Sequence, residues 1–248
     1  RAGEGASDWF LHFDHQELEE GPMGHLIEDR HIREALKANI KKSKQIEYIY
    51  NTEVISKSDE DTGVSLNLSD GRILRSRLLI GCDGRNSNIA KWSNISHIGW
   101  DYNQSALVCA ISHKKPHNGI AHQFFTPSGP LAILPLPGNK SSIVWTETKD
   151  KAKDINIMRD EDYLSALSPV IGNFLGPISL VGDRFSYPLG LSIAESFISN
   201  CTVLVGDSAH GIHPLAGQGL NLGLKDIAAL TEAGEYSATL NYVATANF

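Results

Sequence analysis

Residues 201–226 read CTVLVGDSAHGIHPLAGQGLNLGLKD, and this stretch decides the fold. Its first apolar, β-branched residues predict a short buried strand that ends at Gly206-Asp207. A glycine-bearing loop follows, and the apolar spacing from Leu220 to Thr231 predicts a helix. A strand, a tight loop and a helix in this order are typical of α/β proteins, which bind ligands beyond the carboxyl ends of their strands.

The loop in this stretch carries groups suited to a polar ligand. The Asp207 carboxylate can accept hydrogen bonds from sugar or ribityl hydroxyls. Gly217 and Gly219 permit unusual backbone angles and a close approach of the ligand to the backbone. The start of the following helix offers free N–H groups and a partial positive charge, which favour an anionic atom. Glycines that serve packing alone are the ordinary alternative.

The composition is that of an ordinary globular protein. The 248 residues carry a net charge of −7, and 41% of them are hydrophobic. These values exclude a long disordered tail, a coiled-coil rod and a basic nucleic-acid binder. Cys82, Cys109 and Cys201 lie far apart without metal-ligand spacing, which predicts reduced, buried thiols. No apolar run approaches the roughly 20 residues that a membrane span needs.

The remaining pattern predicts two β/α pieces on either side of an antiparallel sheet. The first piece has a helix at 29–42, strands at 46–56 and 63–68, a hairpin turn at Asp70-Gly71, and a buried strand at 78–81. The sheet has strands at 105–112, 122–126, 131–134 and 142–148, followed by a helix at 160–174 and a strand at 178–187.

Two motifs resemble a known family. Residues 213–226, HPLAGQGLNLGLKD, are similar to the second flavin-contact motif of FAD-dependent aromatic-hydroxylase-type monooxygenases, and most closely to the ubiquinone-biosynthesis hydroxylases. Residues 78–87, LLIGCDGRNS, resemble the Asp-Gly motif of that family, near FAD and the pyridine-nucleotide path. The family usually carries Arg three residues after this serine, where the present chain has Ala90. The resemblance runs from about residue 20 to about residue 232.

The resemblance implies an α/β fold: a partial FAD-binding domain, Rossmann-like and of the glutathione-reductase type, with an inserted, mostly antiparallel β-sheet substrate domain. Residues 1–40 are then a partial opening of the substrate domain with its helix. Residues 41–100 and 191–232 are FAD-binding segments that hold the Asp-Gly and Gly-Asp motifs. Residues 101–190 are the substrate sheet, and residues 233–248 are a divergent tail.

The resemblance also implies a set of site residues. The acid at Asp207 contacts the ribityl chain, the loop 214–219 lies against the isoalloxazine ring, Val54 lies near the adenine, and Glu28 lies on the flavin side. A core residue and a solvated helix start are the ordinary alternatives for Val54 and Glu28. The implied cofactor-binding residues are Asp207, Pro214, Gly217, Gln218, Gly219, Leu220, Asn221, Asp83, Gly84, Val54 and Glu28.

No catalytic base is assigned, although His210 and His213 are candidates because both lie in the loop. An apolar channel for the substrate could be lined by residues of the predicted sheet, with core packing as the alternative for most of them. These residues are Phe124, Phe125, Leu131, Ile133 and Leu134.

The implied activity is an FAD-dependent monooxygenase that hydroxylates the aromatic ring of a polyprenyl-phenol intermediate in ubiquinone biosynthesis, using O2 and reduced flavin. NAD(P)H or a redox partner supplies the electrons. The implied partners are the polyprenyl phenol, O2 and a ubiquinone-biosynthesis complex, with peripheral membrane contact and no nucleic acid. The implied location is intracellular, either in the cytoplasm or peripheral on the inner membrane. In a eukaryote, the protein would lie on the matrix side of the mitochondrial inner membrane.

The sequence contains no Gly-x-Gly-x-x-Gly, the loop that grips the FAD pyrophosphate in the family. We therefore expect an N- and C-terminally incomplete member that binds FAD weakly on its own. Three alternatives remain: a serine hydrolase built on Ser208 and His210, a metal site of Asp207, His210 and His213, and a truncated, non-catalytic remnant that binds lipid or a partner protein.

Overall fold

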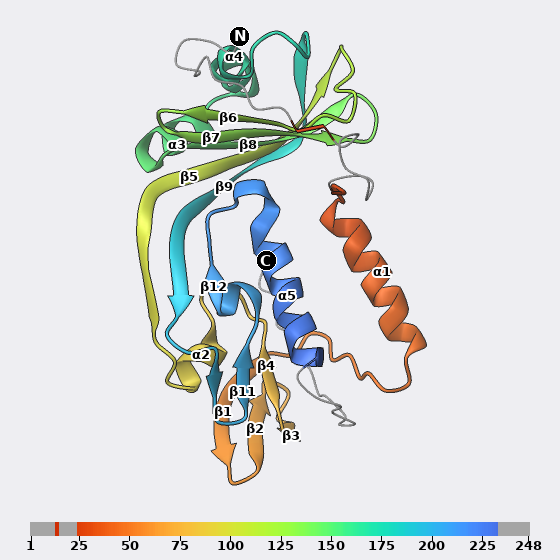
Figure 1. The fold of residues 1–248 in the computed structure, drawn as a ribbon, viewed down its shortest axis with the longest axis vertical. Helices are drawn as coiled ribbons and strands as arrows, with labels where there is room; N and C mark the ends of the chain where they lie inside the picture. The colour runs from red at the N-terminus through yellow and green to blue at the C-terminus, as the bar shows by residue number, and fades with distance from the viewer. Residues whose placement is uncertain (1–12, 15–23, 233–248) are drawn as a thin grey trace. The chain divides into compact units, whose positions relative to one another are not determined.

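The computed structural model describes residues 13–14 and 24–232 (Figure 1). The chain divides into two units, and each is described by itself. One unit, here the β-sheet unit, comprises Arg1–Ile32 and Tyr102–Leu189. The other, here the α/β unit, comprises Arg33–Asp101 and Gly190–Phe248. Residues 33–40, which the sequence groups with the opening segment, therefore lie in the α/β unit. The assignment of the units to FAD and to substrate stays a prediction.

The β-sheet unit is built on long strands in the order β9-β5-β8-β7-β6. Strand β5 pairs antiparallel with β8, β8 with β7, and β7 with β6. Trp145 on β8 lies opposite both Leu107 on β5 and Leu131 on β7. The bounds of these strands are β5 His97–His113, β6 His122–Thr126, β7 Gly129–Leu136, β8 Lys140–Thr148 and β9 Ile178–Ala194.

Alternate residues of these strands form an apolar core with helices α3 (Lys149–Asn156) and α4 (Asp160–Ile171). The core cluster consists of Leu107, Cys109, Ile111, Leu131, Ile133, Ile143, Trp145, Ala152, Ile155, Tyr163, Leu167, Ile171 and Leu175. The period of two along each strand places one set of side chains here and leaves the other set outside. Leu131 and Ile133 are therefore core residues and not channel residues, and Phe124 packs against the same cluster. Phe125, in contrast, is 69% exposed.

Helix α4 ends earlier than the sequence predicts, and helix α3 was not predicted at all. Helix α4 ends at Ile171 and not at residue 174, because Gly172 adopts a φ of +83° and stops the helix. Helix α3 was not predicted, because among its eight residues only Ala152 and Ile155 are buried. Two buried positions are too few to produce a recognisable helical periodicity.

The α/β unit contains two small sheets. Strands β4 (Leu79–Gly81) and β11 (Thr202–Leu204) are parallel neighbours, and β10 (Ile198–Ser199) pairs antiparallel with β11. The second sheet is an antiparallel meander of β1 (Val54–Glu60), β2 (Gly63–Leu68) and β3 (Ile73–Ser76). A core cluster joins these elements: Val64, Leu66, Leu79, Ile89, Ala90, Ile95, Ala194, Leu204 and Ala209.

Two helices of this unit follow the parallel strands along the chain. Helix α2 (Asn88–Trp92) follows β4, and helix α5 (Gln218–Glu232) follows β11 after a loop. Between them lie two short 3₁₀ turns, η2 (Gly206–Ser208) and η3 (Leu215–Gly217), and the two-residue strand β12 (His210–Gly211), which pairs with the end of β9. Helix α1 (Asp29–Lys42) has no buried residue.

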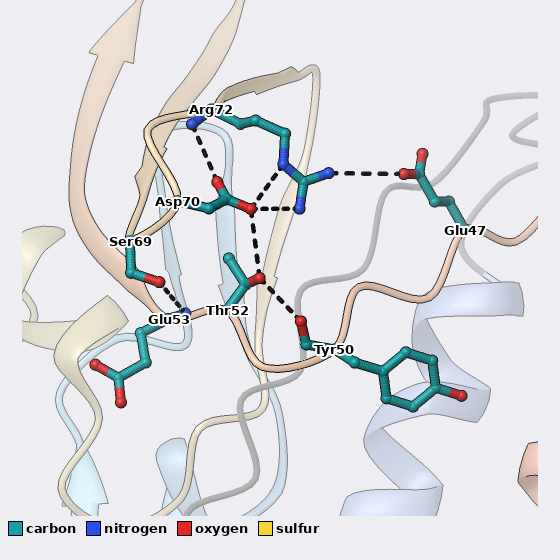
Figure 2. Close-up of polar contacts among 7 residues, drawn as sticks. All are labelled: Glu47, Tyr50, Thr52, Glu53, Ser69, Asp70 and Arg72. Atoms are coloured by element: carbon teal, nitrogen blue, oxygen red, sulfur yellow. Dashed lines mark hydrogen bonds and ion pairs between the residues drawn. The ribbon is translucent and has the colours of Figure 1, made fainter.

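The strand predicted at 46–56 is wrong over most of its length. Residues 46–53 form no strand, and β1 instead runs from Val54 through Glu60. Side chains of the β2–β3 turn hold the irregular segment, as Figure 2 shows: Thr52 Oγ1 donates to Asp70 Oδ2 over 3.4 Å. The Glu53 N–H donates to Ser69 Oγ over 3.0 Å. These side-chain bonds accompany an irregular backbone path where the alternating pattern predicts a strand.

Candidate functional site

The site is built where two parallel strands end. Leu204 of β11 lies opposite Gly81 of β4, so Asp207 and Asp83 follow at the same edge of the sheet. Gly206 turns the chain directly after β11 with a φ of +66°, which a residue with a side chain rarely adopts. The two acids that the sequence singles out are thus brought to neighbouring strand ends.

Arg85 joins the segments of this edge. Its Nε lies 3.3 Å from Asp207 Oδ2. Its Nη1 donates to the Gly190 carbonyl over 3.2 Å, and its Nη2 donates to the Ile212 carbonyl. One guanidinium therefore ties the loop after β4 to the loop after β11 and to strand β9. Arg85 is absent from the predicted site, and its place directly after the Asp-Gly pair is the signal that could have found it.

The start of helix α5 supplies a second side of the site. Pro214 precedes the 3₁₀ turn, and helix α5 begins at Gln218. A Cβ atom placed on Gly219 would lie 3.7 Å from Asp207 Oδ1, so the helix start and the carboxylate are close neighbours. Gln218, Leu220 and Asn221 are exposed here. The structure thus places Gly219, at the start of α5, beside the Asp207 carboxylate.

Only one of the two carboxylate oxygens of Asp83 accepts hydrogen bonds in the described structure. Its Oδ2 accepts the N–H groups of Asn88 (2.8 Å) and Ile89 (3.1 Å) at the start of α2. Its Oδ1 is buried and has no hydrogen-bond partner among the described residues. The family's usual Arg position, Ala90, is 1% exposed and belongs to the core cluster. A long charged side chain would have no room there, so the basic group of this edge is Arg85.

The two candidate bases have different surroundings. His210 is 8% exposed, and its Nε2 lies 2.8 Å from Asp226 Oδ2. Burial, and then the positive charge of Arg85, lower the pKa of His213 from its ordinary value of 6.5. His213 is therefore neutral at neutral pH, and the Nε2 atom of His210 is hydrogen-bonded to Asp226.

The described structure does not support the serine hydrolase or the metal site as alternatives. The Ser208 hydroxyl has the carbonyls of Gly81 and Val205 as acceptors, at 2.6 and 2.8 Å, and accepts the Val205 N–H over 3.1 Å, so it serves the turn. Across residues 13–14 and 24–232, no group of three or more His, Cys, Asp or Glu side chains is arranged to hold a metal ion.

The two remaining predicted cofactor residues, Val54 and Glu28, have local contacts of their own. Val54 begins β1 and packs against the apolar core of the α/β unit, as its ordinary alternative requires. Glu28 belongs to the β-sheet unit, and its Oε1 accepts a 3.0 Å hydrogen bond from Arg30.

Comparison with known proteins decides the family. A family model described as FAD binding domain matches residues 10–233, which is most of the chain. The chain belongs to this family. FAD is the cofactor that this membership implies, and it agrees with the cofactor expected from the motifs.

Among curated proteins, this family member is 39% identical to the ubiquinone hydroxylase UbiL of Rhodospirillum rubrum over 232 residues. The match covers 94% of this chain and 54% of that protein. It is 28% identical to the mitochondrial ubiquinone biosynthesis monooxygenase COQ6 of Rattus norvegicus, over 98% of this chain and 58% of that protein. The chain thus spans a little over half the length of these relatives. The expected resemblance to ubiquinone-biosynthesis hydroxylases is confirmed.

Among solved structures, the FAD-binding family member resembles CmlS, a flavin-dependent halogenase, with a TM-score of 0.71 and 20% identity. That match covers 82% of this chain and 39% of the other. The expected fold class, α/β with an antiparallel β-sheet portion, is confirmed by this likeness. None of the helices in the described ranges has the length and apolar character needed to cross a membrane.

The residues of the site fit part of FAD. The unpartnered Asp83 Oδ1 and the half-exposed Asp207 carboxylate are acceptors suited to ribityl hydroxyls. Gly217 has a φ of +65° and open space where a Cβ would project, so a flat ring could approach its backbone. Asp207, Gly217 and the start of α5 are the groups that would hold the ribityl chain and ring.

Proposed function

We propose that this chain supplies the ribityl and ring contacts of the flavin site in an FAD-dependent hydroxylase of ubiquinone biosynthesis. The observation that carries the proposal is the position of Asp207. At the ends of two parallel strands, its Oδ2 lies 3.3 Å from Arg85 Nε, and its Oδ1 would lie 3.7 Å from a Cβ placed on Gly219. This is the edge at which α/β proteins bind their ligands.

The chain's own groups would each have a task at this site. Asp207 would accept hydrogen bonds from ribityl hydroxyls, and Arg85 would hold its carboxylate in place. The exposed N–H groups at the start of α5 would stabilise negative charge on the ring. When bound, FAD supplies the oxygen chemistry of hydroxylation.

The proposed substrate is a polyprenyl phenol, with O2 as the oxygen source and NAD(P)H or a redox partner as the electron source. The names of the curated relatives support ubiquinone biosynthesis as the pathway. His213, which burial and Arg85 keep neutral at neutral pH, and His210, which contacts Asp226, are the two candidates for accepting the phenol proton. Membership of a ubiquinone-biosynthesis complex and peripheral membrane contact belong to the same proposal.

The test uses the natural protein that carries these 248 residues. It is expressed in a bacterium that lacks a ubiquinone-biosynthesis hydroxylase, and quinone intermediates are measured by mass spectrometry. The expected result is that ubiquinone is restored and a less hydroxylated polyprenyl phenol disappears. Asp207→Ala should abolish this rescue, whereas exposed Asp61→Asn in the β1–β2 turn should leave it intact.

Two results would contradict the proposal. Failure of rescue by a protein that is folded and holds FAD would remove ubiquinone hydroxylation from its function. Full rescue by Asp207→Ala would remove Asp207 from the flavin site. A folded protein that purifies without flavin and retains a lipid or a partner protein would favour the alternative of a non-catalytic binding module.

A further inference from the structure

One carboxylate oxygen of helix α5 receives two groups from the turn after β11. Asp226 Oδ2 accepts the backbone N–H of Gly206 over 2.9 Å. The same oxygen lies 2.8 Å from Nε2 of His210. Gly206 opens the turn that carries Asp207, and His210 closes it. Asp226 therefore holds both ends of the turn from a position 19 residues beyond Asp207 in the sequence.

The face of α5 that carries Asp226 is shaped for this contact. Gly219, Gly223 and Asp226 lie four and three residues apart, so they share one face of the helix. A Cβ atom on Gly223 would lie only 3.3 Å from Gly206 Cα, and one on Gly219 would lie 3.7 Å from Asp207 Oδ1. The small residues let the helix approach the turn, and the acid fastens it.

The chemistry of the pair fixes the state of the histidine ring. An ionised carboxylate only accepts hydrogen bonds, so His210 Nε2 is the donor and carries a proton. The other ring nitrogen, Nδ1, is buried and has no hydrogen-bond partner within the described part of the chain. The side chains of His210 and Asp226 are 10% and 22% exposed, so solvent competes weakly for this bond.

We propose that Asp226 is a positioning residue: with His210 and the Gly206 N–H it clamps the turn to helix α5, and so sets where the Asp207 carboxylate meets the flavin. The role of the clamp toward flavin rests on the function proposed above. The clamp itself rests on two hydrogen bonds to one oxygen and on the glycine face that admits them.

The experiment compares matched variants of the full 248-residue chain. Asp226→Leu keeps the approximate size but removes both acceptors, and Asp226→Asn keeps one oxygen that can still accept. His210→Phe keeps the ring without its donor, and His210→Gln returns an N–H. Asp154→Asn, on the exposed face of α3, is the control for an acid-to-amide change in a helix.

Two measurements distinguish a specific role of Asp226 in positioning the turn from a general contribution to the stability of the chain. Amide hydrogen exchange reports on the Gly206 N–H directly, and titration with riboflavin reports on the Asp207 carboxylate. We expect Asp226→Leu and His210→Phe to speed exchange at Gly206 by about tenfold or more, which corresponds to about 1.4 kcal/mol of lost protection. We expect riboflavin affinity to fall about tenfold in the same variants. Asp226→Asn and His210→Gln should recover most of both losses.

The opposite results overturn the proposal. Unchanged exchange at Gly206 in a folded Asp226→Leu chain would remove the clamp. Faster exchange at Gly206 with unchanged riboflavin affinity would show that Asp226 contributes to stability but does not position Asp207. The same conclusion would follow if Asp226→Asn and His210→Gln recovered neither slow exchange nor riboflavin affinity. If the unsubstituted chain binds no riboflavin, the proposed function fails, and the exchange rates at Gly206 decide the clamp on their own.

Discussion

Nε of Arg85 lies 3.3 Å from Oδ2 of Asp207, although the two residues are 122 positions apart in the sequence. The contact exists because β4 and β11 are parallel neighbours, so the loops that follow them meet at one edge. Arg85 also donates to two backbone carbonyls, of Gly190 and Ile212. The guanidinium thus links the acid proposed to contact the cofactor to the loop that leads to helix α5.

Replacing Asp207 tests the centre of the proposed flavin site. We expect Asp207→Asn to weaken riboflavin binding by about tenfold, because hydrogen bonds to a charged acceptor exceed those to a neutral one by about 1 kcal/mol or more. Isothermal titration or fluorescence quenching of the flavin measures the change. The control is Asp61→Asn, and equal affinities of the two variants would exclude a role for Asp207.

Replacing Arg85 tests whether its geometry matters beyond its charge. Arg85→Lys keeps the charge, but a single ammonium group cannot reach Asp207 and both carbonyls in the fixed fork of a guanidinium. We expect riboflavin binding to weaken by several-fold to about tenfold and amide exchange in residues 210–213 to accelerate. Wild-type behaviour in Arg85→Lys would show that charge alone is enough.

The chain offers groups for the flavin ring and ribityl chain but no Gly-x-Gly-x-x-Gly loop for the pyrophosphate. We therefore expect the isolated 248-residue chain to bind FAD weakly, and no more tightly than riboflavin. Parallel titrations with the two flavins give the comparison directly. A clear preference for FAD, or a chain that purifies with stoichiometric FAD, would mean that these residues grip the pyrophosphate in another way.

The stability of the chain should fall in mild acid. Burial lowers the pKa of His122 in the β-sheet unit, and burial with Arg85 lowers that of His213 in the α/β unit, from 6.5 in each case. Between the lowered pKa and 6.5 the unfolded chain binds more protons than the folded chain does. The contribution of the neutral rings is therefore complete above 6.5 and is lost as the pH falls below it.

Urea denaturation at about pH 7.5 and about pH 5.5 measures this dependence. We expect His122→Gln and His213→Gln each to flatten the decline, and the exposed His25→Gln to leave it unchanged. A decline that is equally steep in all three variants would assign the acid sensitivity to other groups.

Arg184 should matter for the stability of the β-sheet unit. Its guanidinium carbon lies 4.7 Å from the centre of the Tyr163 ring, and its Nη2 donates to the Met158 carbonyl over 2.6 Å. Arg184→Lys should lower the free energy of unfolding by about 1–2 kcal/mol, since lysine stacks less well on the ring and lacks the fork. Arg159→Lys, at a mostly exposed side chain, is the control, and equal losses in both would contradict this role.

Strong periodic signals predicted elements well, and weak or local ones did not. Helix α1 matches its predicted bounds, and helix α5 extends the predicted one by two residues at its start and one at its end. The segment 46–53 alternates like a strand, yet Ser69 and Asp70 bind its backbone and its Thr52 hydroxyl in an irregular path. Side-chain hydrogen bonds between segments 16 to 18 residues apart leave no trace in a hydrophobic pattern.

The sequence by itself determined the family and the two motifs, because fourteen consecutive residues of one loop and helix are a very specific string. It also predicted Asp207, Gly217 and Gly219 as neighbours of the ligand. Only the tertiary structure revealed the contacts of Arg85 with Asp207 and of Asp226 with Gly206 and His210, because these partners lie at the ends of other elements. Hydrogen bonds between residues distant in the sequence depend on strand pairing and helix approach, and a single sequence records neither.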